Sequence, residues 1–337
     1  MSKNKKMNTI NILKTRTKEF FSLWKNYSFI YACYNILWWM CFYTRPPFCN
    51  RLSTYAIKKK TAWLDKYFKK NYSHILNKYN DYEICGSVIT EPKIWVFWGQ
   101  GEDKMPPLVE ACYRQLTHYN ENINLVTIEN VNKYIGLPSI IFEKADVGKI
   151  SWAHFSDSVR NTLLAKYGGL GLDATVWARG EIPFDRLSQV DIFSANGETP
   201  NTSRSTRFWT SFNYNWSTWC MWSRSANNIL YSFVSEMLIA IAEREKQWPD
   251  YVIQDYLIYY AYKNIPGVIE MLEQSKTIPC NNRNELAKVM NNEFNEDKYK
   301  ELTKEDFVFK LSYRTKWRTV TDNGEETFYG RILKNII

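Results

Sequence analysis

The segment from Ser151 to Thr175 constrains the fold more than any other part of the chain. Its first half has apolar residues at helical spacing, namely Trp152, Phe155, Val159, Leu163 and Tyr167. Gly168 and Gly169 then predict the end of that helix, because glycine tolerates the left-handed backbone needed there. Leu170 to Leu172 reads as a short buried strand. Asp173 is therefore predicted at the carboxyl end of a strand, where open α/β sheets bind ligands.

The residues before this segment predict a strand–helix–strand unit. Lys93 to Gly101 is a nearly continuous apolar run, which is typical of a strand buried on both faces. Pro106 and Pro107 open a helix to Tyr119, and Ile123 to Ile128 reads as a second strand. Such a unit indicates an α/β fold with a mixed, mainly parallel sheet.

Basic residues are concentrated at the N-terminus. Residues 1–80 hold 13 Lys and 3 Arg against Glu19 and Asp65, so they carry +14 and leave −5 for the rest of a chain of net charge +9. A protein that bound nucleic acid through its catalytic body would carry the basic excess there, so nucleic acid is not the predicted partner. We expect a basic helical region over residues 1–80 that meets an anionic membrane surface, and a separate domain over residues 85–337.

An aromatic, uncharged segment of 19 residues separates Lys25 from Arg45. It starts too late for a cleavable signal peptide. Three interpretations remain: a helix lying in the membrane interface, a single membrane span, or a core helix. Lysine and arginine flank it on both sides, which favours the interfacial helix. The expected location is cytoplasmic and peripheral at the inner face of the cell membrane, with a single-pass protein as the alternative.

Cysteine and histidine patterns indicate no metal or disulfide framework. The seven cysteines are scattered without a CxxC pair, and the chain has three histidines. Reduced thiols are therefore expected.

Two acids and one arginine around Gly168-Gly169 are the candidates for chemistry. Asp157 and Arg160 are three residues apart on the predicted helix and so share one face. Either they form an ordinary surface ion pair, or Arg160 binds a diphosphate while Asp157 accepts sugar or ribose hydroxyls. Asp173 can meet a divalent cation or sugar hydroxyls. The pair Asp157 and Arg160 together with Gly168-Gly169 and Asp173 indicates a ligand site more specifically than either pattern alone.

These motifs carry a family resemblance. Ser156-Asp157-x-x-Arg160, Tyr167-Gly168-Gly169 and Leu172-Asp173-Ala174-Thr175 resemble the core of the capsular polysaccharide synthesis proteins, which are similar to the DXD-containing, Och1-type sugar transferases. The run from Ile94 to Gly101 with Met105-Pro106-Pro107 matches the family's opening. The resemblance covers roughly residues 90–320. It implies a GT-A-like fold, a nucleotide-sugar donor, transfer of a hexose-type sugar to a growing surface or capsular glycan that is free or lipid-linked, and retention of anomeric configuration.

The resemblance also implies roles for individual residues. Asp157, Arg160 and Asp173 would be catalytic. The donor would be bound by Trp98, Gly99, Gly168, Gly169, Thr175 and Lys310. Lys310 either closes on the diphosphate or is an ordinary solvated strand charge. Thr175 stands where the wider group has its second acid, which leaves the requirement for Mn²⁺ or Mg²⁺ open. Asp255 either replaces that acid beside Asp173 as a metal ligand or is a helix-surface acid.

Further segments complete the expectations. The Trp-rich stretch from Trp209 to Trp222 is expected on the acceptor side, and Asp322 to Glu325 predicts a β-hairpin turn. Helices are predicted over 228–246 and 251–262 and in the basic linker from 52 to 80. Two other functions fit the same residues: a catalytically silent transferase-like subunit, and a membrane-surface adaptor that acts through residues 1–80.

Overall fold

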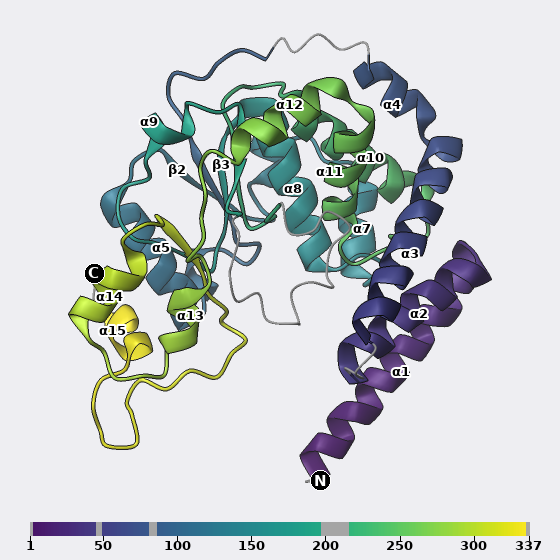
Figure 1. The fold of residues 1–337 in the computed structure, drawn as a ribbon. Helices are drawn as coiled ribbons and strands as arrows, with labels where there is room; N and C mark the ends of the chain where they lie inside the picture. The colour runs from purple at the N-terminus through teal and green to yellow at the C-terminus, as the bar shows by residue number, and fades with distance from the viewer. Residues whose placement is uncertain (1–2, 45–48, 81–85, 197–215, 335–337) are drawn as a thin grey trace.

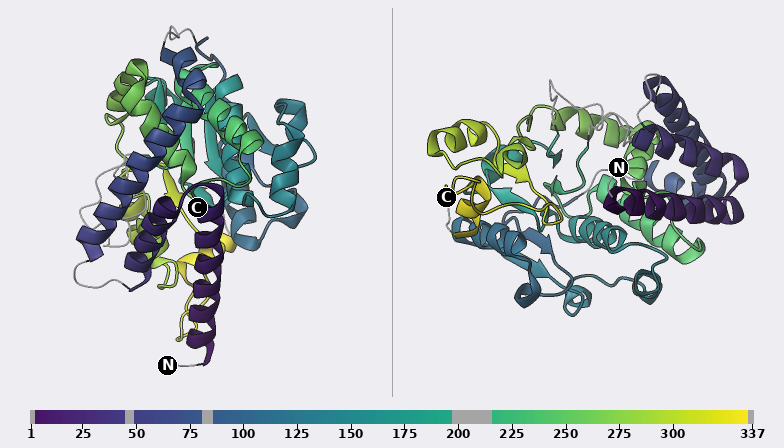
Figure 2. Two further views of the ribbon diagram at one scale, coloured as in Figure 1. Left: turned by 90° about the vertical axis from the view of Figure 1, so that its right-hand side faces the viewer. Right: turned by 90° about the horizontal axis from the view of Figure 1, so that it is seen from below.

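The chain folds into an α/β body with a set of N-terminal helices along one side (Figure 1). This computed structural model describes residues 3–44, 49–80, 86–196 and 216–334. The last three helices of the described chain, α13 to α15 (residues 285–334), lie on the side of the body opposite the N-terminal helices in the views of Figures 1 and 2.

A five-stranded sheet forms the centre of the body, in the order β2-β1-β3-β6-β5. The strands are β1 (Ile94–Phe97), β2 (Ile123–Val126), β3 (Gly169–Asp173), β5 (Ile192–Ser194) and β6 (Cys220–Ser223). Strand β1 pairs in parallel with both β2 and β3, whereas β6 runs antiparallel to β3 and to β5. Four of the five strands thus share one direction, which confirms the predicted mixed, mainly parallel sheet.

Both faces of this sheet are buried. Trp95 belongs to the apolar cluster beneath helices α8 (Trp152–Tyr167) and α10 (Ile229–Arg244), while Ile94 and Val96 belong to the cluster on the side of α5 (Pro107–Tyr119). Alternate residues of a strand point to opposite faces, so a strand covered on both sides is apolar throughout. This is the physical reason for the run predicted as a buried strand.

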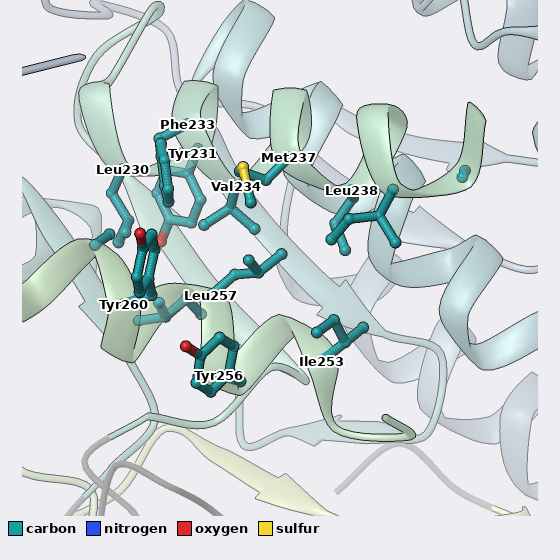
Figure 3. Close-up of a cluster of buried hydrophobic side chains, with 14 of the residues drawn as sticks. Leu230, Tyr231, Phe233, Val234, Met237, Leu238, Ile253, Tyr256, Leu257 and Tyr260 are labelled. Carbon is teal, nitrogen blue, oxygen red and sulfur yellow. The ribbon is translucent and has the colours of Figure 1, made fainter. Parts of the chain in front are cut away.

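The largest apolar cluster joins α10 to α11 (Ile253–Asn264). Figure 3 shows Phe233 and Met237 of α10 facing Leu257 and Tyr260 of α11. Helix α12 (Pro266–Ser275) adds Val268, Met271 and Leu272 to it. This cluster supports α8 from behind and so holds the helix that carries Asp157 and Arg160.

A second, two-stranded sheet connects distant parts of the chain. Strand β4 (Val176–Ala178) pairs antiparallel with β7 (Val308–Lys310), and Val176 lies opposite Lys310. Since β4 follows β3 after a two-residue turn, this pairing carries Lys310 to the carboxyl end of β3.

Four helices form the N-terminal region: α1 (Lys3–Asn26), α2 (Phe29–Thr44), α3 (Cys49–Asn71) and α4 (Ser73–Asn80). Of the aromatic segment predicted at a membrane interface, Tyr31, Trp38 and Trp39 are buried inside the protein. None of the described helices combines the length and apolar character needed to cross a membrane. Among residues whose side chains are described, Cys33, Cys112, Cys220 and Cys280 are free thiols.

Short helices complete the described chain: η1 (Glu102–Lys104), α6 (Val131–Tyr134), α7 (Ser139–Asp146), α9 (Phe184–Leu187), α13 (Glu285–Val289), α14 (Glu296–Thr303) and α15 (Phe328–Lys334). The predicted turn at Asp322 to Glu325 is confirmed, and the Thr321 N–H donates to the Glu325 carbonyl across it. The flanking segments, expected over 317–321 and 326–329, form only an isolated bridge between Val320 and Glu326, because α15 begins at Phe328.

Candidate active site

A cavity of about 880 Å³ opens at the carboxyl edge of the sheet. Seven of the residues predicted for the site line it: Trp98, Gly99, Asp157, Arg160, Asp173, Asp255 and Lys310. The register explains part of this convergence, because Phe97 of β1 lies opposite Asp173 of β3. The residues that follow two parallel neighbouring strands must therefore meet at one edge.

Asp173 is the centre of a small hydrogen-bonded group. Its Oδ1 accepts bonds from the Thr175 backbone N–H at 2.9 Å and the Thr175 hydroxyl at 2.8 Å. Lys310 Nζ lies 3.2 Å from the same oxygen and donates to the Thr175 hydroxyl. Burial alone would raise the pKa of Asp173. The positive charges of Lys310 and Arg160 and the two bonds from Thr175 outweigh burial and hold that pKa well below its usual range.

Helix α8 presents Asp157 and Arg160 to the same cavity. The helix begins with a capping box, in which the Ser151 hydroxyl accepts from the His154 N–H at 3.2 Å. Arg160 Nη1 lies 3.3 Å from Asp157 Oδ1 and donates to the Thr218 carbonyl at 2.8 Å, while Nη2 donates to the Ser156 hydroxyl at 3.1 Å. Arg160 is 6% exposed, so the pair is no ordinary surface ion pair.

The two carboxyl groups of the cavity have opposite electrostatic properties. Burial raises the pKa of Asp157 to about 7; the guanidinium of Arg160 opposes this shift, and the charge of Asp173 adds to it. Asp173 is ionised at neutral pH, whereas Asp157 exchanges a proton near that pH. Two carboxyl groups whose pKa values differ in this way suit different roles in one site.

Gly168 and Gly169 act on the strand rather than on the cavity. Their φ angles are +66° and +92°, and a Cβ on Gly169 would lie 2.3 Å from the Lys93 carbonyl oxygen. They stand at the start of β3, about 13 Å along the strand from Asp173, and they do not line the cavity. The expectation that they contact the donor is therefore replaced by a structural role: they allow α8 to turn directly into a central strand.

Gly171 has a role that the sequence interpretation missed. A Cβ there would lie 2.7 Å from Cγ of Arg160, so only glycine lets the arginine side chain cross β3 at this height. The signal that was available is the Gly-Leu-Gly spacing of residues 169–171.

Aromatic side chains line much of the cavity. The ring of Trp98 packs edge-on against Tyr313, with centroids 5.7 Å apart. Trp152, Trp216, Trp219 and Tyr251 also line it. Of the predicted acceptor stretch, residues 216–219 reach the cavity, and residues 209–215 lie outside the described part of the chain.

The acids of this site do not build a metal cage by themselves. Asp255, at the start of α11, is buried and lines the cavity. Across the described residues, however, no three His, Cys, Asp or Glu side chains come together as a ligand group. Oδ1 of Asp173 is also already occupied by Lys310 and by both Thr175 donors. This donor set fits a resident ammonium group better than a divalent ion that depends on several carboxylates.

Fold and site together define the class: an α/β protein with a charged, aromatic-lined ligand cavity at the carboxyl edge of its sheet. The chain belongs to the capsular polysaccharide synthesis protein family, whose model matches residues 48–332. The match begins within the N-terminal helices and ends in α15. Helices α1 and α2 precede it.

Two further comparisons complete this description. No curated protein matches the chain. Among solved structures, it is similar to one described as "PaToxG Glycosyltransferase", at 13% identity and a TM-score of 0.35, over 75% of this chain and 98% of that one.

Proposed function

We propose that the protein is a glycosyltransferase that moves a sugar from a nucleotide-sugar donor to a glycan acceptor. Membership in the capsular polysaccharide synthesis family supports sugar transfer in general. The observation that carries the proposal for this chain is the group of Asp173, Lys310 and Arg160 in a cavity with Trp98. Thr175 does not line the cavity; it is buried and bonds to Asp173. The cavity combines cations that can bind a diphosphate, carboxylates that can accept bonds from hydroxyl groups, and an aromatic face on which the nucleobase of the donor can stack.

Arg160 and Lys310 would hold the diphosphate. The bond between the anomeric carbon and the phosphate oxygen breaks during transfer, and the departing diphosphate gains negative charge. Two fixed cations at that position stabilise the charge without reorganising, which is the usual source of large rate effects. Arg160 is anchored by Ser156 and Thr218, and Lys310 by Asp173 and Thr175.

Asp173 and Asp157 would bind hydroxyl groups of the donor. An ionised carboxylate accepts hydrogen bonds from two hydroxyls at once, and the depressed pKa keeps Asp173 in that form. Trp98 would stack on the base, with Tyr313 supporting its ring from the edge. The Mn²⁺ or Mg²⁺ expected at Asp173 and Asp255 is a separate hypothesis. The contact between Lys310 and Asp173 argues for a site in which Lys310 carries that charge.

We further propose a retaining reaction, as the family resemblance implies. The acceptor oxygen attacks the anomeric carbon as the phosphate oxygen leaves. The departing phosphate oxygen takes the proton of the acceptor hydroxyl. No protein base is then required. A growing capsular or surface glycan, free or lipid-linked, is the proposed acceptor, and Trp216 and Trp219 offer faces on which sugar rings stack.

The test measures the full-length protein against a panel of nucleotide sugars that includes UDP-glucose, UDP-galactose and GDP-mannose. Thermal stabilisation reports binding, and release of the nucleoside diphosphate reports catalysis. Lys310→Met should abolish most release, whereas Lys316→Met, an exposed lysine outside the cavity, should not. Stabilisation without release, in wild type and with added acceptor glycans, would identify a silent subunit instead.

Metal dependence is tested in the same assay. With Lys310 as the resident cation, EDTA should leave donor binding within about twofold. Donor binding that strictly requires Mn²⁺ or Mg²⁺, and that no longer responds to the metal in Asp173→Asn and in Asp255→Asn, would overturn the assignment of Lys310 as the resident cation.

A further inference from the structure

The outer face of α1 is an exposed apolar stripe bordered by lysines. Leu13, Phe21 and Trp24 are 61%, 56% and 48% exposed. Successive residues of a helix are about 100° apart, so these three side chains fall within an arc of about 80°. Lys14, Lys25 and Lys18 occupy the adjoining arc and are also exposed. Half-exposed aromatic rings on a helix that the protein does not cover call for a partner.

The stripe continues onto the start of α2. Phe29 packs on Phe20 at 6.0 Å and on Trp24 at 5.1 Å between ring centroids. Phe29 and its neighbour Ile30 are 50% and 59% exposed. The corner between the two helices therefore carries one continuous apolar surface, which we call the α1–α2 patch: Leu13, Phe21, Trp24, Phe29 and Ile30.

Negative charge is kept off this surface. From Leu13 to Asn26, the part of α1 whose side chains are described, Glu19 is the single acid. It points inward, where it is paired with Arg16 and accepts from Asn35 at 2.9 Å. The opposite face of the helix buries Leu23. Helix α1 is thus amphipathic, with an apolar and cationic outer side and a packed inner side.

We propose that the α1–α2 patch docks on an anionic lipid surface. Aromatic and aliphatic side chains enter the boundary between headgroups and acyl chains, and flanking lysines meet the lipid charge. A second copy of the chain fits this face less well, because a symmetric pair would bring the same lysines against each other. The patch lies on α1 and α2, whereas the family match begins at residue 48.

The docked helices are attached to the cavity wall. Tyr27 donates to the Gln247 carbonyl, and Tyr31 donates to the Pro249 carbonyl at 2.9 Å. Lys60 of α3 forms a buried ion pair with Asp250 at 2.6 Å. The next residue, Tyr251, lines the cavity. If the proposed transferase function holds, this connection joins the wall of the cavity that includes Tyr251 to the docked helices, which favours a lipid-linked acceptor.

The experiment is flotation of the full-length protein with vesicles of phosphatidylcholine alone or with about 30 mol % phosphatidylglycerol. Binding should require the anionic lipid. Lys14→Gln/Lys18→Gln/Lys25→Gln should weaken partitioning on the order of 100-fold, and Phe21→Ser/Trp24→Ser should weaken it comparably. The matched control, Lys133→Gln/Lys149→Gln/Lys298→Gln, changes three exposed lysines outside α1 and should bind like wild type.

Two outcomes would overturn the inference. One is equal weakening by the control lysines, which would indicate nonspecific attraction of a basic protein. The other is absence of flotation together with a concentration-dependent mass in solution that Trp24→Ser abolishes, which would identify a second copy as the occupant. Nucleotide-sugar hydrolysis is measured in parallel, and the patch variants should keep it. Flotation without any hydrolysis would refute the proposed transferase while leaving membrane docking intact.

Discussion

Replacing Gly171 with alanine tests whether a buried, fixed Arg160 holds the donor. The added methyl group would lie 2.7 Å from Cγ and 3.1 Å from Cδ of Arg160. The arginine is 6% exposed and its guanidinium is held by the Thr218 carbonyl, Ser156 and Asp157. It cannot move aside without losing some of these contacts.

Two separable effects follow from this displacement. Forcing a methyl group into a packed position costs about 1–3 kcal/mol of stability. Moving the guanidinium off the diphosphate forfeits a charge-assisted contact of about 1.5–3 kcal/mol, or roughly 10- to 150-fold in kcat/KM. The control is Gly180→Ala, where an added Cβ meets nothing within 4 Å and φ lies outside the left-handed region.

Urea unfolding and nucleoside diphosphate release measure the two effects. Gly171→Ala should lose both stability and kcat/KM, and Gly180→Ala should lose neither. Loss of stability with unchanged kcat/KM would show that Arg160 is a packing residue that does not contact the donor. If Gly171→Ala and Gly180→Ala behave alike in both assays, the close packing of Arg160 against residue 171 is refuted.

Three further predictions concern charge and backbone. The raised pKa of Asp157 means that its ionised form opposes folding above about pH 4 and fully above pH 7, so Asp157→Asn should add about 2 kcal/mol to the free energy of unfolding at pH 8 and little at pH 4. Wild-type activity should also rise through about pH 7, and the variant should lack that rise in a pH–rate profile. Gly169→Ala, with φ +92° and its Cβ 2.3 Å from a carbonyl oxygen, should cost at least about 3 kcal/mol in urea unfolding or prevent folding. Asp250→Asn leaves Lys60 as an uncompensated buried charge and should cost about 3–5 kcal/mol, and the added change Lys60→Met should recover most of that loss. If the double variant is no more stable than Asp250→Asn, the pair is not buried as described.

The N-terminal helices change how the aromatic excess of this chain is understood. The uncharged segment between Lys25 and Arg45 looks like the membrane-facing element. In the folded protein its Tyr31, Trp38 and Trp39 are core residues. Phe21 and Trp24 are exposed on α1, which has interspersed lysines and a lower mean hydropathy, and Phe29 is exposed at the start of α2. The mean hydropathy of this segment therefore does not tell which of its side chains are exposed, because that depends on how α2 packs against α1, α3 and the body.

Several parts of the site were predictable from local rules. The spacing of Trp152, Phe155 and Val159 predicted α8, and the pair Gly168-Gly169 predicted its end. The apolar run after Lys93 predicted the buried strand whose carboxyl end meets that of β3. Each of these inferences uses side-chain period or backbone freedom, which act within a few residues.

Other parts required the tertiary structure. Lys310 reaches Asp173 because β7 pairs with β4. Lys310 and its partner Thr175 are 135 positions apart in the sequence, and no local pattern predicts their contact. The same holds for Tyr313 against Trp98 and for Lys60 against Asp250.

By itself, the sequence determined the helix that carries Asp157 and Arg160, the buried strands beside it and the acid that ends the central strand, since helical spacing, strand burial and glycine's backbone freedom are local properties. The tertiary structure alone decided which cation faces that acid, why Gly171 must lack a side chain, and which aromatic rings remain exposed. Those depend on contacts between segments whose encounter is governed by the packing of the whole chain.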